Sequence, residues 1–206
     1  ADMTVTFIGL KLGLLTNNGP EVVGELNFAD LSVPSDVFDA IEPSVRMLSY
    51  EDQVRKMPVR NRNAHKTNHG HVLVVGGDHG MAGAVAMAAE AAMYSGAGLV
   101  SVATHPTSVS PLVARRPEVM TRGVTTVDEL KALVDRATVV VVGPGLGSDS
   151  TWGSELFNVV LESELPMIID ADGLNLLSRL PRKSARRDNW VLTPHPGEAR
   201  NLLDKK

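Results

Sequence analysis

Four loops rich in Gly, Pro, Asp and His follow four apolar, strand-like runs in this sequence. The runs and their loops occupy residues 71–84, 138–147, 166–175 and 190–198. In a parallel α/β sheet the carboxyl ends of all strands lie at one edge, and ligands bind in the crevice beyond that edge. The four loops are therefore expected to form one site. Their glycines leave backbone N–H groups bare at the start of helices, so the composition favours a phosphate-bearing ligand.

The first two of these loops are defined by glycine. GGDHGMAGA has glycines at 76, 77, 80 and 83, but neither the spacing of a Rossmann fingerprint nor the Gly-Lys-Ser/Thr of a P-loop. GPGLG places glycines at 143, 145 and 147 directly after four valines. Each loop could be a tight strand–helix turn that needs positive φ, or a place where a ligand approaches the backbone closely. For GPGLG, its position after a central strand favours the second alternative.

The other two loops carry acids and a histidine. In DADGLN, one of Asp170 and Asp172 could orient a ligand hydroxyl or a metal-bound water, while the other, most simply Asp172, would N-cap the next helix. In TPHPGE, His195 is held between two prolines and could hydrogen-bond a ligand. Glu198 could hold Mg²⁺ through water or complement the helix dipole, and for an isolated Glu the dipole is the stronger alternative.

Two further groups of charged residues carry less information. His65, His69 and His71 share their spacing with no Cys or carboxylate, so we do not expect zinc there. The basic residues between 179 and 187 are expected to lie in a solvated loop.

Alternating strands and helices must position the four loops. We expect strands at 71–77, 99–104, 138–143, 167–170 and 191–193, and helices at 81–95, 127–137, 151–163, near 174–180 and from 197. Either Ser150 or Thr151 could N-cap the helix at 151–163. Continuous apolar runs such as VVVV are typical of strands buried on both faces. The pattern predicts an α/β fold, with a mainly parallel sheet and helices on both of its faces.

The first third of the chain has a different pattern. Strands are expected at 4–10 and 21–28, with a turn at 17–20 between them. Residues 30–64 contain three prolines and are predicted to form a linker with one helical turn at 49–56. Because the chain opens inside a strand-like run and ends inside a helix-like one, we expect it to be a segment of a longer protein.

The composition narrows the classes of function. Of the 206 residues, 43% are hydrophobic and 21% charged, and the net charge is −4, so we expect no nucleic-acid partner and no anionic membrane. The absence of cysteine excludes disulfides, thiolate catalysis and Cys-based zinc sites, and is compatible with a cytoplasmic protein. No apolar run approaches the roughly 20 residues that span a bilayer.

The motifs taken together resemble a known family. HKTNHGHVLVVGGDHGMAGA, SGAGLVSVAT, RPEVM, VVVVGPGLG, DADGLN and LTPHPGE, in this order, are similar to the ADP/ATP-dependent NAD(P)H-hydrate dehydratases, which have a ribokinase-like fold. ADMTVTFIGLKLGLLT and GELNFADLSVP are similar to the C-terminal end of the Rossmann-like NAD(P)H-hydrate epimerase domain. The resemblance implies two parts, residues 1–49 from the epimerase end and linker, and residues 50–206 from the N-terminal part of the dehydratase, as in bifunctional repair enzymes.

The resemblance implies repair of nicotinamide nucleotides. The dehydratase, a lyase, uses ADP or ATP to phosphorylate the ring hydroxyl of hydrated NADH or NADPH and then eliminates phosphate. The epimerase, an isomerase, interconverts the two hydrate epimers. The implied cofactors are ADP or ATP, Mg²⁺ and, in the epimerase part, K⁺. The implied partners are these small molecules.

Site residues follow from the resemblance position by position. Hydrate-binding positions are Gly83, Ala84, Gly145, Gly147 and His195, and supporting positions are Asp170, Asp172, Asn175 and Glu198. His195 replaces the Asn of the ribokinase-like Asn-x-x-Glu magnesium motif, which argues against direct ligation of magnesium by Glu198. Asp2 matches a substrate-contacting acid of the epimerase, and Thr6 matches a potassium ligand. The family's nucleotide-binding lysine loop and its Gly-x-Gly-Asp motif with the catalytic Asp are not found, so we expect residues 1–206 to be inactive alone.

Two alternatives to this function stay open from the residues. The first is a small-molecule kinase of the same fold, such as one for a vitamin precursor, whose sequences share part of HPGE. The second is a non-catalytic, nucleotide-binding module. In either case an uncovered apolar sheet edge is expected to favour homo-oligomers.

Overall fold

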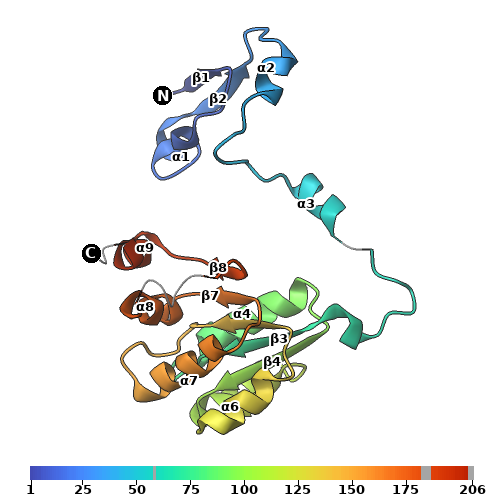
Figure 1. The fold of residues 1–206 in the computed structure, drawn as a ribbon, viewed down its shortest axis with the longest axis vertical. Helices are drawn as coiled ribbons and strands as arrows, with labels where there is room; N and C mark the ends of the chain where they lie inside the picture. Colours follow the sequence, from blue (N-terminus) through green and yellow to red (C-terminus); the bar gives the residue numbers. More distant parts are fainter. Residues whose placement is uncertain (58, 182–186, 204–206) are drawn as a thin grey trace. The chain divides into compact units, whose positions relative to one another are not determined.

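A computed structural model describes residues 1–57, 59–181 and 187–203. The chain divides into two compact units, Ala1–Arg60 and Asn61–Lys206 (Figure 1). None of the helices in the described ranges is both long and apolar enough to cross a membrane.

The first unit is built on two parallel strands, β1 (Met3–Phe7) and β2 (Glu25–Ala29). Between them lie η1 (Leu12–Leu14) and α1 (Gly19–Val22), and after them α2 (Ser35–Asp39) and α3 (Tyr50–Lys56). Both strands and α3 agree with the sequence prediction. The turn predicted at 17–20 instead leads into α1, because Pro20 suits the first turn of a helix. The short α2 lies in the segment predicted to be a linker.

The second unit is a six-stranded sheet in which every neighbouring pair is parallel. Its strand order is β5-β4-β3-β6-β7-β8. The strands are β3 (His71–Val75), β4 (Leu99–Thr104), β5 (Met120–Gly123), β6 (Val139–Val142), β7 (Met167–Ile169) and β8 (Trp190–Leu192). The chain runs outward from β3 to β5, then returns to β6 and continues outward to β8. The direction therefore switches between β3 and β6, which is where open α/β sheets bind ligands.

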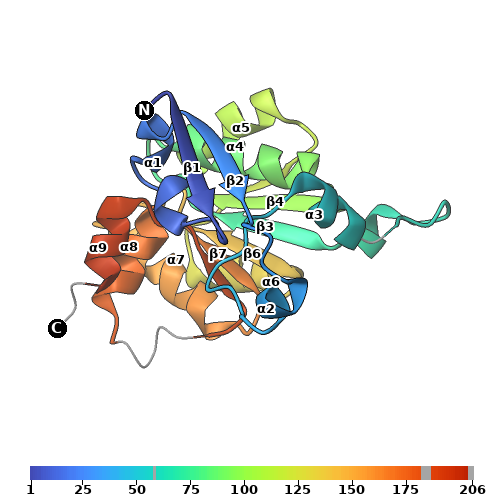
Figure 2. The same cartoon turned by 90° about the horizontal axis from the view of Figure 1, so that it is seen from above.

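Helices cover both faces of this sheet, as predicted. They are α4 (Ala82–Tyr94), α5 (Val109–Arg115), α6 (Val127–Val134), α7 (Thr151–Glu162), α8 (Asp172–Arg179) and α9 (Pro196–Leu203), with the short turns η2 (Lys66–His69) and η3 (Pro106–Ser108). Alternate residues of β3 divide between the two faces: Leu73 and Val75 pack with α6, α7 and α8, whereas Val74 packs with α4 and α5. Helices α8 and α9 lie side by side in both ribbon views (Figures 1 and 2).

Three local features either depart from the sequence prediction or decide between alternatives that the sequence left open. Ser150 caps α7, since its Oγ accepts the Gly153 N–H at 2.9 Å. Helix α6 ends at Val134 rather than 137, and its start is fixed by a capping box between Thr126 and Glu129. Helix α5 and strand β5 were not predicted, because Pro111 interrupts the first and the four residues of the second lack strand-like alternation.

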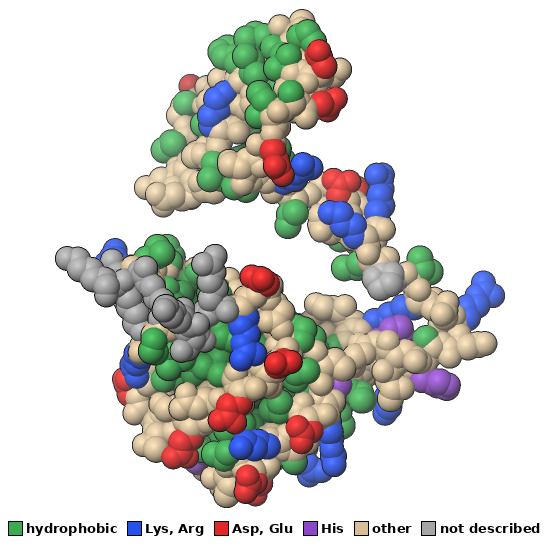
Figure 3. Space-filling view, viewed as in Figure 1, with side chains coloured by type: hydrophobic (Ala, Val, Ile, Leu, Met, Phe, Trp, Pro, Cys, Tyr) green, Lys and Arg blue, Asp and Glu red, His purple; other side chains and the backbone are tan. Residues whose placement is uncertain are grey.

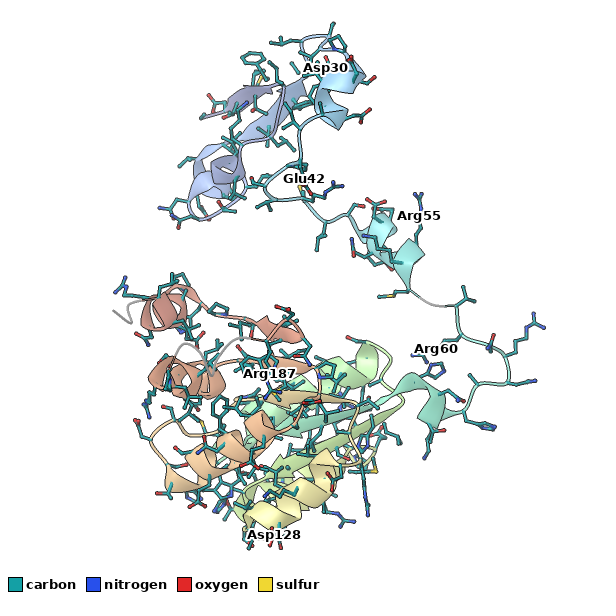
Figure 4. The ribbon with its side chains drawn as sticks, in the orientation of Figure 1. Asp30, Glu42, Arg55, Arg60, Asp128 and Arg187 are labelled. Carbon is teal, nitrogen blue, oxygen red and sulfur yellow. The ribbon has the colours of Figure 1, made fainter. Side chains whose placement is uncertain are left out.

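The basic run from 179 to 187 is not simply solvated. Residues 182–186 lie outside the described ranges, but both flanking arginines make specific contacts. Arg179 binds the Asp149 carboxylate at 2.8 Å and the Ser148 carbonyl. Arg187, labelled in Figure 4, donates to the Ser163 and Leu161 carbonyls at the end of α7 and lies over the Trp190 ring. The two arginines therefore hold α7 and β8 in place.

The β8 edge of the sheet is sparsely covered. Val191 and Leu192 of the edge strand β8 are 57% and 40% exposed, and they are apolar. On the face of the second unit that Figure 3 shows, acidic and basic side chains are interspersed. The described apolar surface at β8 is consistent with the expected uncovered edge, and oligomerisation stays a prediction.

Candidate functional site

The first two glycine loops are joined by backbone hydrogen bonds at the β3–β6 switch point. The Gly77 N–H donates to the Pro144 carbonyl at 3.0 Å, and the Asp78 N–H donates to the Gly145 carbonyl at 2.7 Å. Gly145 has a φ of +59°, and a Cβ there would lie 2.7 Å from the Met81 Cβ and 3.3 Å from the Ala84 Cβ. Close approach of the two loops therefore requires glycine at 145, and it brings Gly145 and Ala84 together.

The third loop is attached to the second by a carboxylate. Asp172 Oδ2 accepts the Gly147 N–H at 2.9 Å. The prediction that Asp172 is an N-cap was wrong: α8 begins at Asp172, the preceding Ala171 has a φ of +47°, and no side chain caps the helix. The carboxylate points to the neighbouring loop instead. The backbones of the second and third loops also lie close together, because a Cβ on Gly143 would collide with the Asp170 carbonyl.

The fourth loop is attached to the third and ends in a reciprocal cap. Thr193 Oγ1 donates to Asp170 Oδ1 at 2.8 Å. His195 Nδ1 accepts the Gly197 N–H at 3.0 Å, while the His195 N–H donates to Glu198 Oε2 at 2.9 Å. Because Nδ1 accepts, the neutral ring carries its proton on Nε2, which lies 3.3 Å from Glu198 Oε1. Glu198 is only 8% exposed, so it orients His195 as well as facing the start of α9.

The expected bare N–H groups of the first loop are already used inside the protein. The N–H groups of Gly76, Gly77 and Asp78 donate to carbonyls of Ala103, Pro144 and Gly145. The next one, of His79, donates at 2.7 Å to the Asp78 carboxylate. The N–H groups of residues 76–79 are therefore not the bare donors expected from the sequence, and Gly76 and Gly77 serve the packing of loop against loop.

The predicted residues of the second unit lie along one edge, and they do not converge on a point. Ala84 and Gly145 are neighbours, with Gly83 exposed beside them and Gly147 next along the loop. Asn175 is oriented otherwise: its Oδ1 accepts from Asn201 at 3.4 Å and joins α8 to α9. The loop of His195 follows β8, two strands from β6, which is about 10 Å at the usual strand spacing. Only an extended ligand could contact both ends.

Sequence reasoning passed over several side chains at this edge. Asp78 lies beside Gly147, where an added Cβ would be 2.6 Å from Asp78 Oδ2, so Asp78 and Asp172 place carboxylates on this one glycine. His79 and His105 follow β3 and β4. His79 lies within the first of the four loops, and His105 stands directly after a strand-like run, so the rule that selected the loops could have found both. No group of three or more His, Asp or Glu side chains among the described residues is placed to hold a metal ion.

Asp2 and Thr6, the two predicted site residues of the first unit, differ in burial. Asp2 is exposed and Thr6 is buried, with its hydroxyl donating to the Gly9 carbonyl at 3.1 Å. The Lys11 ammonium donates to the same carbonyl at 2.9 Å. A substrate contact at Asp2 and a potassium ligand at Thr6 stay predictions.

A strongly shifted carboxyl and an apolar hollow both lie away from the loops. Glu90 is bound by Arg115 at 2.6 Å and by Arg116 at 2.8 Å, and these guanidinium groups lower the pKa of Glu90 to about 2. This network joins α4 to α5. A hollow of about 590 Å³ is lined by Gly70, Ala92 and Thr138 among others, at the opposite end of the strands. Neither feature faces the glycine loops.

The comparisons with known proteins identify the family of this chain. A family model described as NAD(P)H-hydrate dehydratase matches residues 72–206, which include all six strands of the sheet except the first residue of β3. The chain belongs to the NAD(P)H-hydrate dehydratase family. This confirms the resemblance seen in the motifs, and the family's ribokinase-like fold agrees with the sheet described above.

Individual relatives extend over both units. The bifunctional NAD(P)H-hydrate repair enzyme of Coxiella burnetii is 50% identical over 203 residues, which cover 98% of this chain and 41% of that protein. A ribokinase-like superfamily protein from Enterococcus faecalis has a TM-score of 0.69 at 30% identity, over 78% of this chain and 59% of that one. An ADP/ATP-dependent NAD(P)H-hydrate dehydratase from Bacillus subtilis, co-crystallised with ATP/Mg²⁺, has a TM-score of 0.60 at 29% identity, over 74% and 54%. The chain thus spans less than half the length of the curated relative.

Proposed function

We propose that this chain forms the substrate-side part of an ADP- or ATP-dependent NAD(P)H-hydrate dehydratase that repairs hydrated NADH and NADPH. The observation that carries the proposal is the row of four packed loops at the carboxyl edge of a family-typical sheet. Its length suits a dinucleotide, because Gly145 and His195 lie in loops about 10 Å apart. The same row would be unnecessarily long for a small vitamin precursor.

The chemistry explains why a dehydratase would have a kinase-like fold. Hydroxide is a poor leaving group and phosphate is a good one, so phosphorylating the ring hydroxyl would allow the ring to lose that oxygen as phosphate and recover its double bond. ADP or ATP with Mg²⁺ supplies that phosphate. Of the residues in this chain, Glu198 is the candidate for contact with Mg²⁺, but its Oε2 and Oε1 atoms face the His195 N–H and ring. That geometry fits contact through a water molecule and does not fit direct ligation.

The surroundings of each predicted site residue are compatible with a role in this function. Gly83 and Ala84 would contact the hydrate at the start of α4, and Gly145 and Gly147 would do so through the second loop. His195, held by Glu198, would offer its exposed ring to the ligand. Asp170, Asp172 and Asn175 would support these loops from behind, since their described hydrogen bonds run to other loops and to α9.

The first unit extends the proposal to a bifunctional enzyme. We assign residues 1–49 to the C-terminal end of an epimerase domain and its linker, and residues 50–206 to the dehydratase. The support is the match of the Coxiella burnetii repair enzyme over 98% of this chain. Asp2 would contact the hydrate in the epimerase reaction, and Thr6 would bind K⁺ through its hydroxyl oxygen. A cytoplasmic location would follow from the substrates.

Ligand-induced stabilisation tests the proposed substrate. Hydrated NADH at about 100 times its Kd should stabilise the chain by about 2.7 kcal/mol. For a protein of this size that is about 5–11 °C in melting temperature. Hydroxymethylpyrimidine, the ligand expected for a vitamin-precursor kinase, should give no shift and is the matched control. A shift with hydroxymethylpyrimidine and none with hydrated NADH would overturn the proposal in favour of the kinase.

A further inference from the structure

A second polar cluster adjoins the glycine loops on the β4 side. It consists of His79 after β3, His105 after β4, Thr107 in η3 and Trp152 in the first turn of α7. The His79 and His105 rings meet edge to face, with centroids 6.1 Å apart and planes at 79°. His105 meets Trp152 in the same way at 5.7 Å. The two imidazoles are therefore side by side and oriented by an aromatic neighbour.

Thr107 fixes which ring nitrogen of each histidine carries a proton. His105 Nδ1 accepts the Thr107 N–H at 3.4 Å, so it has no proton, and it lies 2.8 Å from Thr107 Oγ1. The Thr107 hydroxyl must therefore donate to His105. Its oxygen can then only accept from His79 Nδ1, 3.3 Å away. In the neutral rings this leaves an Nε2–H donor on His105 and an Nε2 acceptor on His79.

The cluster is held from beneath by buried groups. Thr104 Oγ1, which is fully buried, donates to the Gly77 carbonyl at 2.8 Å. Ser108 Oγ, 2% exposed as a residue, lies 3.5 Å from the Asp78 carbonyl. Trp152 Nε1 donates to the Val124 carbonyl at 2.8 Å. These bonds join the ends of β3, β4 and β5, so the two histidines are positioned before any ligand arrives.

The two Nε2 atoms are the part of the cluster that is open to a ligand. No hydrogen bond to either Nε2 occurs within the described part of the chain, His79 is exposed and His105 is half-buried. The nearby carboxylates of Asp78 and Asp172 at Gly147 make this corner unfavourable for phosphate. A neutral ligand group that both accepts and donates a hydrogen bond suits the pair.

We propose that His79 and His105 form a recognition pair for a neutral donor–acceptor group on the hydrated nicotinamide ring, with Thr107 as the residue that positions both. The ring carries two groups of this kind, its hydroxyl and its primary carboxamide. The proposal rests on the proposed function for the identity of the ligand. The arrangement of protons on the two rings follows from the geometry alone.

Imidazole nitrogen NMR on residues 1–206 tests both parts. At about pH 8, where imidazole is neutral, His105 should be the Nε2–H tautomer and His79 the Nδ1–H tautomer. Adding hydrated NADH should shift both Nε2 signals. His71 is the internal control, because its nitrogens face the Arg136 carbonyl at 3.0 Å and Ser101 Oγ at 2.7 Å. NADH, which has the carboxamide but lacks the hydroxyl, separates the sources: a shift with NADH assigns the carboxamide, and a shift with the hydrate alone assigns the hydroxyl.

Variants connect the tautomers to binding. Thr107→Val should abolish the defined tautomer of His79, which depends on the hydroxyl, whereas His105 should keep its tautomer because its Nδ1 still accepts the backbone N–H of residue 107. Thr107→Ser should keep both tautomers. His79→Ala should raise the Kd for hydrated NADH about 3- to 10-fold, as loss of one neutral hydrogen bond does. His69→Ala, a half-buried control at the opposite end of the strands, should leave the Kd unchanged.

Three results would overturn the pair, and a fourth separates it from the proposed function. The same tautomer on both free rings refutes the role of Thr107. If added pyrophosphate produces the shifts expected for the hydrate and both rings become protonated, the pair is an anion site and the proposal is refuted. Shifts at His195 without shifts at His79 and His105 refute the pair alone. No shift at any residue of the glycine loops with the hydrate refutes the proposed function, and the ligand assignment falls with it.

Discussion

The bond between Asp172 and the Gly147 N–H is the sharpest test of the claim that the loops form one unit. It joins two loops 25 residues apart at 2.9 Å. A hydrogen bond to a charged acceptor contributes about 1.5–3 kcal/mol net. Since the Asp172 residue is only half-buried, we take about 1–2 kcal/mol for its loss in Asp172→Ala. That corresponds to about a 5- to 30-fold change in the local opening equilibrium.

Amide hydrogen exchange measures this opening directly. In Asp172→Ala the Gly147 amide should exchange about 5- to 30-fold faster. In Asp172→Asn the amide oxygen can still accept, so the increase should be smaller, because a neutral acceptor gives roughly half the strength. Asp149→Ala is the control, since its carboxylate, in the same loop, binds Arg179. An unchanged Gly147 rate in Asp172→Ala, with the fold intact, would refute the reasoning that this carboxylate holds the two loops together.

Three further predictions concern the loops and the fold that supports them. Gly145→Ala should destabilise the protein by about 2–5 kcal/mol in urea unfolding, from the left-handed backbone and the contact with Met81; Gly80→Ala, with φ +77° in open space, should cost only about 1–2 kcal/mol, and equal losses would contradict this account. The pKa of Glu90 is about 2 in the folded protein and its ordinary value is 4.5, so its contribution to stability is present above pH 4.5 and is lost as the pH falls to about 2. Glu90→Gln should therefore reduce the dependence of the unfolding free energy on pH in that window. An unaltered pH profile would contradict the ion pair. His195→Ala should cost about 1 kcal/mol in thermal unfolding through loss of the α9 cap, whereas His195→Asn, which can still accept at that position, should recover most of it.

Much of the architecture could be predicted from the chain because its local signals agree with one another. Valine runs such as 139–142 alternate between two buried faces, and helices with capping residues such as Ser150 follow the strands. Elements lacking that agreement escaped prediction. β5 has no apolar alternation, and α5 has Ser-Pro in its first turn, so nothing local distinguishes either from a loop.

The position of the four loops was predictable from the sequence, and the contacts between them were less so. Strand ends identify the loops, but contacts between loops are long-range and invisible in local sequence. Asp172 was read as a cap because Asp commonly caps helices, yet its carboxylate binds Gly147, 25 residues away. The N–H groups after β3 were read as free for phosphate, yet Pro144 and Gly145 accept them. The glycines of the motif GGDHG are thus explained by the packing of two loops, without reference to a ligand.

Mapping the contacts of hydrated NADH on the backbone amides of residues 1–206 is the most direct test of the central claim. The claim is that the ligand lies along the loops at the carboxyl edge of the sheet. The account predicts shift changes concentrated at residues 78–84, 143–147 and 195–198. Changes confined to the hollow at Gly70, Ala92 and Thr138, at the opposite end of the strands, would contradict it.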